Sequence, residues 1–283
     1  MAHINKLHYK ENLNGVKADI VAKGVFEDDK KHWTITSGQM KGKVGDLAFS
    51  FNKKEKTLFF GLGKKKEATA ENFRRAGGAI VNFLIDKKYG SLAVECPTGG
   101  MEAYNCQAFT EGLILSSYRF LDYFSDERAN YYLKNITMVG TCNKNASKKG
   151  VIIANAVCDS RDLGNHPGNV TTPTRLANFA KEVGKKGNMK ITIFDRDEFT
   201  KMGMGSFAGV ALGTNEPPKF IIMEYFGGSK KDKPVLLVGK GLTFDTGGIS
   251  LKPGLRMDEM KFDMCGSAVV FGAMNAIATL KPK

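Results

Sequence analysis

The residues best suited to chemistry lie in one glycine-rich segment, residues 238–268, which contains the stretches VGKGLTFDTGG, ISLKP and MDEMKFDMCGSA. Two lysines and two aspartates stand in it: Lys240, Asp245, Lys252 and Asp263. Acidic and basic side chains gathered around a glycine-rich turn, directly after an apolar strand, are typical of an active site. The segment therefore predicts an active site.

An apolar strand and a glycine-rich turn are predicted to position the first two of these residues. The run PVLLVGKG, residues 234–241, is bounded by Pro and Gly and is typical of a buried parallel strand. Lys240 stands at its carboxyl end, where open α/β sheets bind ligands. Asp245 follows in a loop whose Gly247 and Gly248 permit backbone conformations closed to other residues, so its carboxylate can be aimed at a fixed point.

A helix is predicted to carry the last of the four residues. From about Met257 the pattern is helical, and the spacings i, i+3, i+4 and i+7 place on one face Met260, Asp263, Met264 and Ser267. Burying the charge of Asp263 on a largely apolar face costs several kcal/mol unless a cation or a hydrogen-bond donor meets it. A metal ion is one such cation. Met260 taken alone is more often a core residue than part of a specificity pocket.

Two simpler interpretations of the segment are weaker. A phosphate-binding turn needs the spacing GxxxxGK[ST], whereas GKG is followed here by Leu and Thr. A single Asp or Lys in a loop is usually solvated surface, but four of them within one glycine-rich segment favour a site.

The segment resembles the metal-binding region of the leucyl (cytosol) aminopeptidase family, dinuclear metallopeptidases that remove N-terminal residues from peptides. The resemblance implies that Lys240, Asp245 and Asp263 are metal ligands. It also implies that Lys252 is the catalytic lysine that polarises the scissile carbonyl, and that Met260 lines the pocket for the first side chain of the substrate.

The resemblance further implies two divalent metal ions, Mn²⁺ or Zn²⁺, and the chemistry agrees. Two such ions bind the free amine of a peptide, polarise its carbonyl and lower the pKa of a bridging water. Lys240 coordinates only as the neutral amine, from which a neighbouring dication removes the proton, whereas Lys252 must keep its charge to stabilise an oxyanion. We therefore expect different surroundings to hold these two lysines in opposite protonation states.

Other segments extend the resemblance over most of the chain: residues 111–123, 161–177 and 194–225. In the family, a motif with an aspartate, a glutamate and an arginine lies several tens of residues beyond the position of Asp263, and this sequence stops at Lys283. We therefore expect three candidate ligands for two ions, weak or partial metal binding, and a chain that resembles a truncated peptidase.

Composition indicates a soluble protein of a reducing, cytoplasmic compartment. The length of 283 residues allows two domains with their own cores, and a hydrophobic content of 42% is ordinary. The N-terminus lacks an apolar targeting region, and no run of membrane-spanning length is expected. The five cysteines have no metal-ligand spacing and are expected to be reduced core thiols: Cys96, Cys106, Cys142, Cys158 and Cys265.

The net charge of +13 is the unusual property of the composition. Lysine clusters such as residues 64–66 and 148–149 could contact the phosphates of a nucleic acid. Scattered lysines beside turn residues are more often a solvated face, and no aromatic residues are interleaved with them for base stacking. Salt-dependent nonspecific binding is thus favoured over recognition.

The element pattern predicts two α/β domains joined by a long helix, the second an incomplete, mainly parallel sheet. Residues 1–145 are expected to form the N-terminal domain, residues 146–166 the linker helix, and residues 167–283 the first half of a peptidase catalytic domain. Strands are expected at VGDLAFSF, KTLFFGLG, SLAVEC, KNITMVG, KITIF, FAGVALG and FIIMEY, and further helices near residues 69–87 and 174–183.

Two functional hypotheses from different classes remain open. One is a leucyl-aminopeptidase-type metallopeptidase acting on peptides with a free N-terminus, which the resemblance places in a homo-oligomer, a hexamer. The other is a catalytically dead remnant, or a binding module, whose N-terminal domain binds a nucleotide or a nucleic acid. Metal content distinguishes the two.

Overall fold

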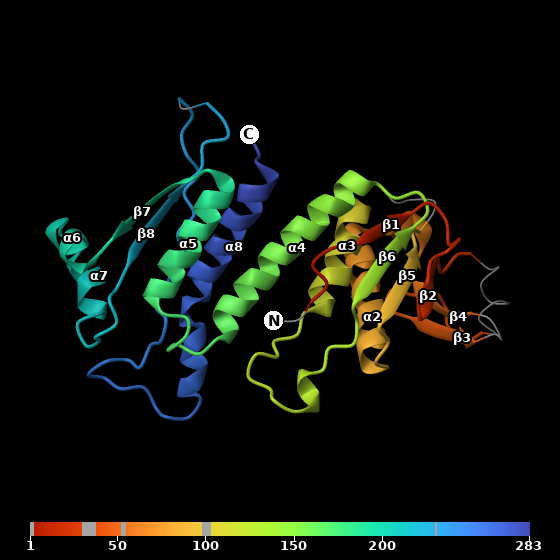
Figure 1. The fold of residues 1–283 in the computed structure, drawn as a ribbon, viewed down its shortest axis with the longest axis horizontal. Coiled ribbons are helices and arrows are strands. Elements are labelled where there is room, and N and C mark those ends of the chain that lie inside the picture. Colours follow the sequence, from red (N-terminus) through yellow and green to blue (C-terminus); the bar gives the residue numbers. More distant parts are fainter. Residues whose placement is uncertain (1–2, 30–37, 52–54, 98–102, 230) are drawn as a thin grey trace. The chain divides into compact units, whose positions relative to one another are not determined.

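The chain folds into two compact units, Met1–Asn155 and Ala156–Lys283. The structure is a computed structural model, and it describes residues 3–29, 38–51, 55–97, 103–229 and 231–283 (Figure 1). The division falls inside helix α4 (Lys144–Asn165), the helix that the sequence predicts between the domains.

A six-stranded, mainly parallel sheet forms the centre of the first unit. Its spatial order is β1-β6-β5-β2-β4-β3, and only β3 runs antiparallel to its neighbour. The strands are β1 (His8–Lys10), β2 (Ile20–Val25), β3 (Leu47–Phe51), β4 (Lys56–Gly61), β5 (Ser91–Glu95) and β6 (Asn135–Val139). The predicted α/β class is confirmed here, because the apolar runs at β4, β5 and β6 are buried in the core as parallel strands require.

The helices of this unit pack through very close backbone contacts. They are α2 (Ala70–Asp86) and α3 (Ala103–Ser117), with short 3₁₀ turns η1 (Lys65–Glu67) and η2 (Glu127–Ala129). A Cβ on Gly112 of α3 would lie 2.0 Å from the carbonyl oxygen of Arg74 on α2, so only glycine fits. The Arg74 guanidinium also donates to the buried carboxylate of Glu111 at 2.8 Å, which fastens the two helices.

The second unit is built from a two-stranded sheet and helices. Its elements are α5 (Pro173–Gly187), β7 (Lys190–Phe194), α6 (Arg196–Lys201), α7 (Gly205–Val210), β8 (Phe220–Glu224), the 3₁₀ helix η3 (Met257–Met264) and α8 (Cys265–Leu280). Phe179 of α5 meets Phe271 of α8 edge-on at 5.8 Å, and Ile191 of β7 packs against both helices. This cluster anchors the start of α8.

The sheet of the second unit differs from the prediction. A mainly parallel sheet was expected, but β7 and β8 pair antiparallel. The stretch FAGVALG, predicted as a strand, instead contains most of the helix α7. Phe207 explains the difference, because from a helix it packs edge-on against both Phe199 at 4.9 Å and Phe220 at 5.7 Å.

The predicted buried strand at residues 234–241 is also wrong for this structure. The segment has no strand assignment, and among the described residues no ladder partner pairs with it. Val235, Leu236 and Val238 are 89%, 82% and 84% exposed. Its apolar, β-branched composition suits a strand, but a strand needs a neighbouring edge, and the β7–β8 pair does not supply one.

One helical stretch is longer and more apolar than expected. By length and composition alone, Met257–Leu280 could cross a membrane, so the expectation that no run reaches that length is wrong. Within the unit, however, Ala268, Phe271 and Met274 are buried in hydrophobic clusters. The core helix of a soluble protein can satisfy the same criteria, and 39% of the apolar window of this stretch is buried.

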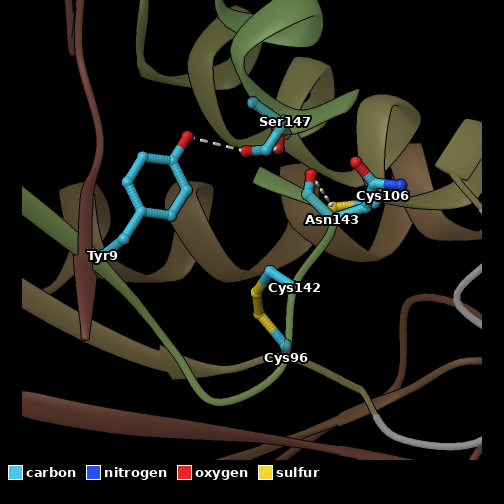
Figure 2. Close-up of a disulfide and its surroundings, with 7 residues drawn as sticks. Tyr9, Cys96, Cys106, Cys142, Asn143 and Ser147 are labelled. Carbon is cyan, nitrogen blue, oxygen red and sulfur yellow. Dashed lines mark hydrogen bonds between the residues drawn. A yellow bond between two sulfur atoms is a disulfide. The ribbon is translucent and has the colours of Figure 1, made fainter. Parts of the chain in front are cut away.

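The expectation of five reduced cysteines is wrong for one pair. Cys96 and Cys142 form a disulfide with a Cα–Cα distance of 5.9 Å (Figure 2). The reason is topological: β5 and β6 pair in parallel, so the residues that follow them emerge side by side. Cys106, Cys158 and Cys265 are free thiols, as expected.

Candidate active site

Two glycines fix the loop that carries Lys240 against the beginning of α8. A Cβ on Gly239 would lie 2.5 Å from the carbonyl oxygen of Gly266, and a Cβ on Gly266 would lie 2.9 Å from the nitrogen of Lys240. The nitrogen of Ser267 donates a hydrogen bond of 2.7 Å to the carbonyl oxygen of Lys240. The backbones therefore touch, and the side chain of Lys240 is held beside the end of η3. The sequence analysis did not single out either glycine. The signal that could have found them is a Gly next to Lys240 and a second Gly at the start of the helix, because two backbones approach closely only where side chains are absent.

Lys240 and Asp263 form the first ion pair of the site. The Lys240 ammonium lies 2.9 Å from Oδ2 of Asp263, and this hydrogen-bonded contact raises the pKa of Lys240. Oδ2 of Asp263 is buried, and no other donor in the described part of the chain reaches it. The Lys240 side chain is nevertheless 60% exposed, whereas that of Asp263 is 23% exposed. A buried carboxylate oxygen is thus met by a solvent-exposed cation.

Asp245 and Lys252 form the second ion pair, across a glycine turn. Oδ2 of Asp245 accepts a hydrogen bond of 2.6 Å from Lys252 Nζ, and Oδ1 accepts one of 2.8 Å from the nitrogen of Gly247. These two donors, Lys252 first, hold the pKa of Asp245 below its usual value. Gly247 has φ +89°, and the nitrogen of Lys252 closes the turn on the carbonyl oxygen of Thr246 at 2.9 Å.

The last predicted residue, Met260, lies against the second pair. Its sulfur is 3.2 Å from Lys252 Nζ. The predicted helix from Met257 is present, but its first part, η3, is a 3₁₀ helix. With three residues per turn, Met260 and Asp263 still share one face. Asp245 also raises the pKa of Lys240, so the two ion pairs are close enough to interact. The structure therefore brings all five predicted residues into one cluster.

The donor set fits part of a divalent-metal site. No group of three or more His, Cys, Asp or Glu side chains converges anywhere in the described ranges. The donors at hand are one amine and two carboxylates, from Lys240, Asp245 and Asp263, and N and O donors of this kind suit Zn²⁺ or Mn²⁺. Each carboxylate already has a cation within 3 Å: the ammonium of Lys240 for Asp263 and that of Lys252 for Asp245. Three donors are about the number that one catalytic ion takes from a protein.

A separate cavity of about 380 Å³ lies between α5 and β7. Its polar lining includes Lys181, Lys219 and Asp195, and the last two form an ion pair. None of the five predicted site residues lines it, so it does not belong to the cluster.

Comparison with known proteins identifies the family of both units. Residues 159–283 match the catalytic domain of the cytosol aminopeptidase family, and residues 34–127 match the N-terminal domain of the same family. Both matches agree with the resemblance seen in the sequence.

Curated relatives match most of this chain. A probable cytosol aminopeptidase of Aromatoleum aromaticum is 41% identical over 238 residues, which cover 80% of this chain and 48% of the relative. A cytosol aminopeptidase of Pseudomonas aeruginosa is 38% identical over 265 residues, 87% of this chain and 53% of the relative. The chain thus spans about half the length of the curated relatives it matches.

Solved structures share the fold. The bottromycin maturation enzyme BotP in complex with Mn aligns with a TM-score of 0.79 and 29% identity, over 93% of this chain and 57% of that one. A mutant of tomato leucine aminopeptidase aligns with a TM-score of 0.81 over 98% of this chain and 60% of that one, at 23% identity, which supports the fold alone.

Proposed function

We propose that this chain, which belongs to the cytosol aminopeptidase family, is part of a metallopeptidase that removes N-terminal amino acids from peptides. The observation that carries the proposal is the pairing of Lys240 with Asp263 beside that of Lys252 with Asp245. Two carboxylates and two amines in contact supply both metal ligands and a charge for the transition state.

Lys240, Asp245 and Asp263 would hold a divalent metal ion, Mn²⁺ or Zn²⁺, as part of a site for two ions. When bound, such ions polarise the peptide carbonyl and activate a water molecule. Lys240 would hold an ion only as the neutral amine, and its ion pair with Asp263 raises the pKa of Lys240. The Lys240 side chain is 60% exposed, which leaves it room to change partner.

Lys252 would be the catalytic lysine, and Met260 would line the pocket for the first side chain of the peptide. Asp245 and the sulfur of Met260 hold the Lys252 ammonium at 2.6 and 3.2 Å, so its charge is fixed before a substrate arrives. A preorganised cation of this kind stabilises the negative charge that develops on the carbonyl oxygen.

The setting of this activity is proposed from the relatives. Their names place them in the cytosol, and we infer a cytoplasmic location from these names. From the family resemblance we propose peptides with a free N-terminus as substrates and a homo-oligomer, a hexamer, as the assembly. Residues 1–145 would form the N-terminal domain, 146–166 the linker helix, and 167–283 the first half of the catalytic domain. The family favours this function over a nucleotide-binding or nucleic-acid-binding module.

The test uses the full-length protein, loaded with Mn²⁺. Lys252→Ala should lower kcat for a leucyl amide by roughly 10² to 10³, the usual loss for one oxyanion-stabilising group, with metal content unchanged. Asp263→Ala should lower metal content first. Lys233→Ala, an exposed lysine of the same unit, is the matched control and should change neither quantity. Full activity in Lys252→Ala, with normal metal content, would refute the assigned role.

A further inference from the structure

The Cys96–Cys142 pair lies where two neighbouring strands end. Cys96 directly follows β5, and Cys142 lies between β6 and α4. The nitrogen of Cys96 donates to the carbonyl oxygen of Val139 at 2.8 Å, which continues the β5–β6 ladder up to the pair. The Cα–Cα distance of 5.9 Å is within the range that a disulfide spans without moving the backbone. The strand pairing therefore holds the two cysteines at a distance at which their sulfurs can form a disulfide.

The two sulfurs differ in access and surroundings. Cys96 is 4% exposed and belongs to the hydrophobic core, whereas Cys142 packs only in part against it. Cys142 stands just before the 22-residue helix α4 and is partly exposed. A reagent from solution therefore reaches Cys142 first, whereas Cys96 is nearly closed to it.

The other cysteines do not compete for this chemistry. Cys106 is buried, and its thiol donates to the carbonyl oxygen of Asn143 at 3.5 Å (Figure 2). Burial raises the pKa of Cys106 and raises that of Cys158 to about 12, and Cys265 belongs to the other unit. A protonated, buried thiol is a poor nucleophile toward a reagent that comes from solution.

The disulfide fastens the same turn that a set of hydrogen bonds already holds. Oδ1 of Asn143 accepts from the nitrogen of Ala146 at 3.0 Å, in the first turn of α4. The hydroxyl of Ser147 contacts that of Thr110 on α3 at 2.7 Å. It also contacts the hydroxyl of Tyr9 on β1 at 2.9 Å (Figure 2). These bonds tie the start of α4 to α3 and β1, and the disulfide adds a covalent tie to β5.

We propose that Cys96 and Cys142 form a reversible redox centre that reacts with a low-molecular-weight disulfide and locks the start of α4 to β5. The Cys142 thiolate attacks one sulfur of glutathione disulfide, the glutathione S–S bond breaks, and a glutathione thiolate leaves. Cys96, held beside Cys142, then attacks the Cys142 sulfur, loses its proton to a departing glutathione thiolate and releases the second glutathione. Two protein thiols and one glutathione disulfide thus give one protein disulfide and two glutathione thiols. The centre is independent of the peptidase proposal.

The order of attack is tested by trapping the mixed disulfide. With oxidised glutathione, Cys96→Ser should accumulate one glutathione on Cys142, because no thiol resolves it, whereas Cys142→Ser should leave Cys96 unmodified. Peptide mapping by mass spectrometry locates the adduct. Cys106→Ser is the matched control and should close the disulfide like the parent chain. Glutathione on Cys96 in Cys142→Ser, at the rate seen for Cys142, would overturn the assignment.

The structural consequence is tested on the parent chain itself. Oxidation should raise the midpoint of thermal unfolding by roughly 5–15 °C, because the bond closes a long loop of the unfolded chain, and a dithiol reductant should reverse the shift. Rapid alkylation during oxidation should capture Cys142-bound glutathione before closure, even if a variant fails to fold. A parent chain that remains a dithiol in excess oxidised glutathione would overturn the proposal.

Discussion

The turn between Asp245 and Lys252 offers a test with a built-in control. Gly247 has φ +89° and Gly248 has φ +75°, a region that costs a residue with a Cβ about 1–2 kcal/mol. A Cβ on Gly247 would also lie 2.4 Å from the carbonyl oxygen of Ser250, whereas a Cβ on Gly248 would meet nothing within 4 Å. Alanine at either position carries a similar backbone strain from the positive φ, and only Gly247→Ala adds a steric clash.

The size of the effect follows from that clash. Carbon and carbonyl oxygen approach to about 3.3 Å in proteins, so Gly247→Ala forces the two atoms apart by about 0.9 Å. The same turn holds the hydrogen bonds from the nitrogen of Gly247 to Asp245 and from the nitrogen of Lys252 to Thr246. A displacement of about 1 Å in a catalytic group costs up to about 10² in rate. Gly247→Ala should therefore lose at least about tenfold more kcat/KM than Gly248→Ala.

The assay compares kcat/KM for a leucyl amide in the complete Mn²⁺-loaded polypeptide, with Mn²⁺ affinity measured by calorimetry as a second readout. Circular dichroism establishes that both variants are folded. Gly254→Ala, where a Cβ meets open space and φ is ordinary, should behave like the parent protein. Equal losses at Gly247 and Gly248 would mean that backbone strain alone matters. Parent-like kcat/KM and Mn²⁺ affinity for Gly247→Ala would mean that this turn does not position the residues of the site.

Three further predictions concern stability and reactivity. Gly112→Ala should destabilise the chain by roughly 1–3 kcal/mol or more in urea, because its Cβ meets the backbone of Arg74, whereas Gly209→Ala, which meets open space in α7, should stabilise its unit by about 0.5–1 kcal/mol. Cys158, with a pKa of about 12, should resist iodoacetamide at pH 8 until urea unfolds the chain, and fast native alkylation would contradict its burial. Val235→Lys should change the unfolding free energy of this chain by no more than about 0.5 kcal/mol, since the side chain is 89% exposed, and a loss of several kcal/mol would mean that the segment is a buried strand.

The sequence predicted most elements of the first unit because local and tertiary signals agree there. The helix expected near residues 69–87 is α2, with Thr69 as its N-cap, and the runs SLAVEC and KNITMVG contain β5 and β6. Each run is short, apolar and bounded by turn residues, and each is buried as its composition requires. In these elements the local sequence pattern and the tertiary packing favour the same secondary structure.

The failures lie where the sequence carries no information about neighbours. Residues 234–241 have strand composition, but strand formation depends on a partner edge that no local pattern encodes. The FAGVALG run is too short to distinguish the 3.6-residue period of a helix from the two-residue period of a strand. The contacts of Phe207 with Phe199 and Phe220 favour the helix. The disulfide likewise depends on strand order, because Cys96 and Cys142 are 46 positions apart and meet only through the β5–β6 pairing.

The site residues were predicted as a set, but only the structure suggests why two lysines in one cluster would play opposite parts. Among the described residues, Lys240 forms an ion pair with one carboxylate, that of Asp263, and its side chain is 60% exposed, so a dication would displace it at little cost in packing. Lys252 is 36% exposed and is held by both Asp245 and Met260. Its ammonium cannot leave without breaking a charge-assisted hydrogen bond of 2.6 Å. Under the proposed function, the lysine free to move becomes the ligand, and the lysine held in place keeps its proton for the substrate.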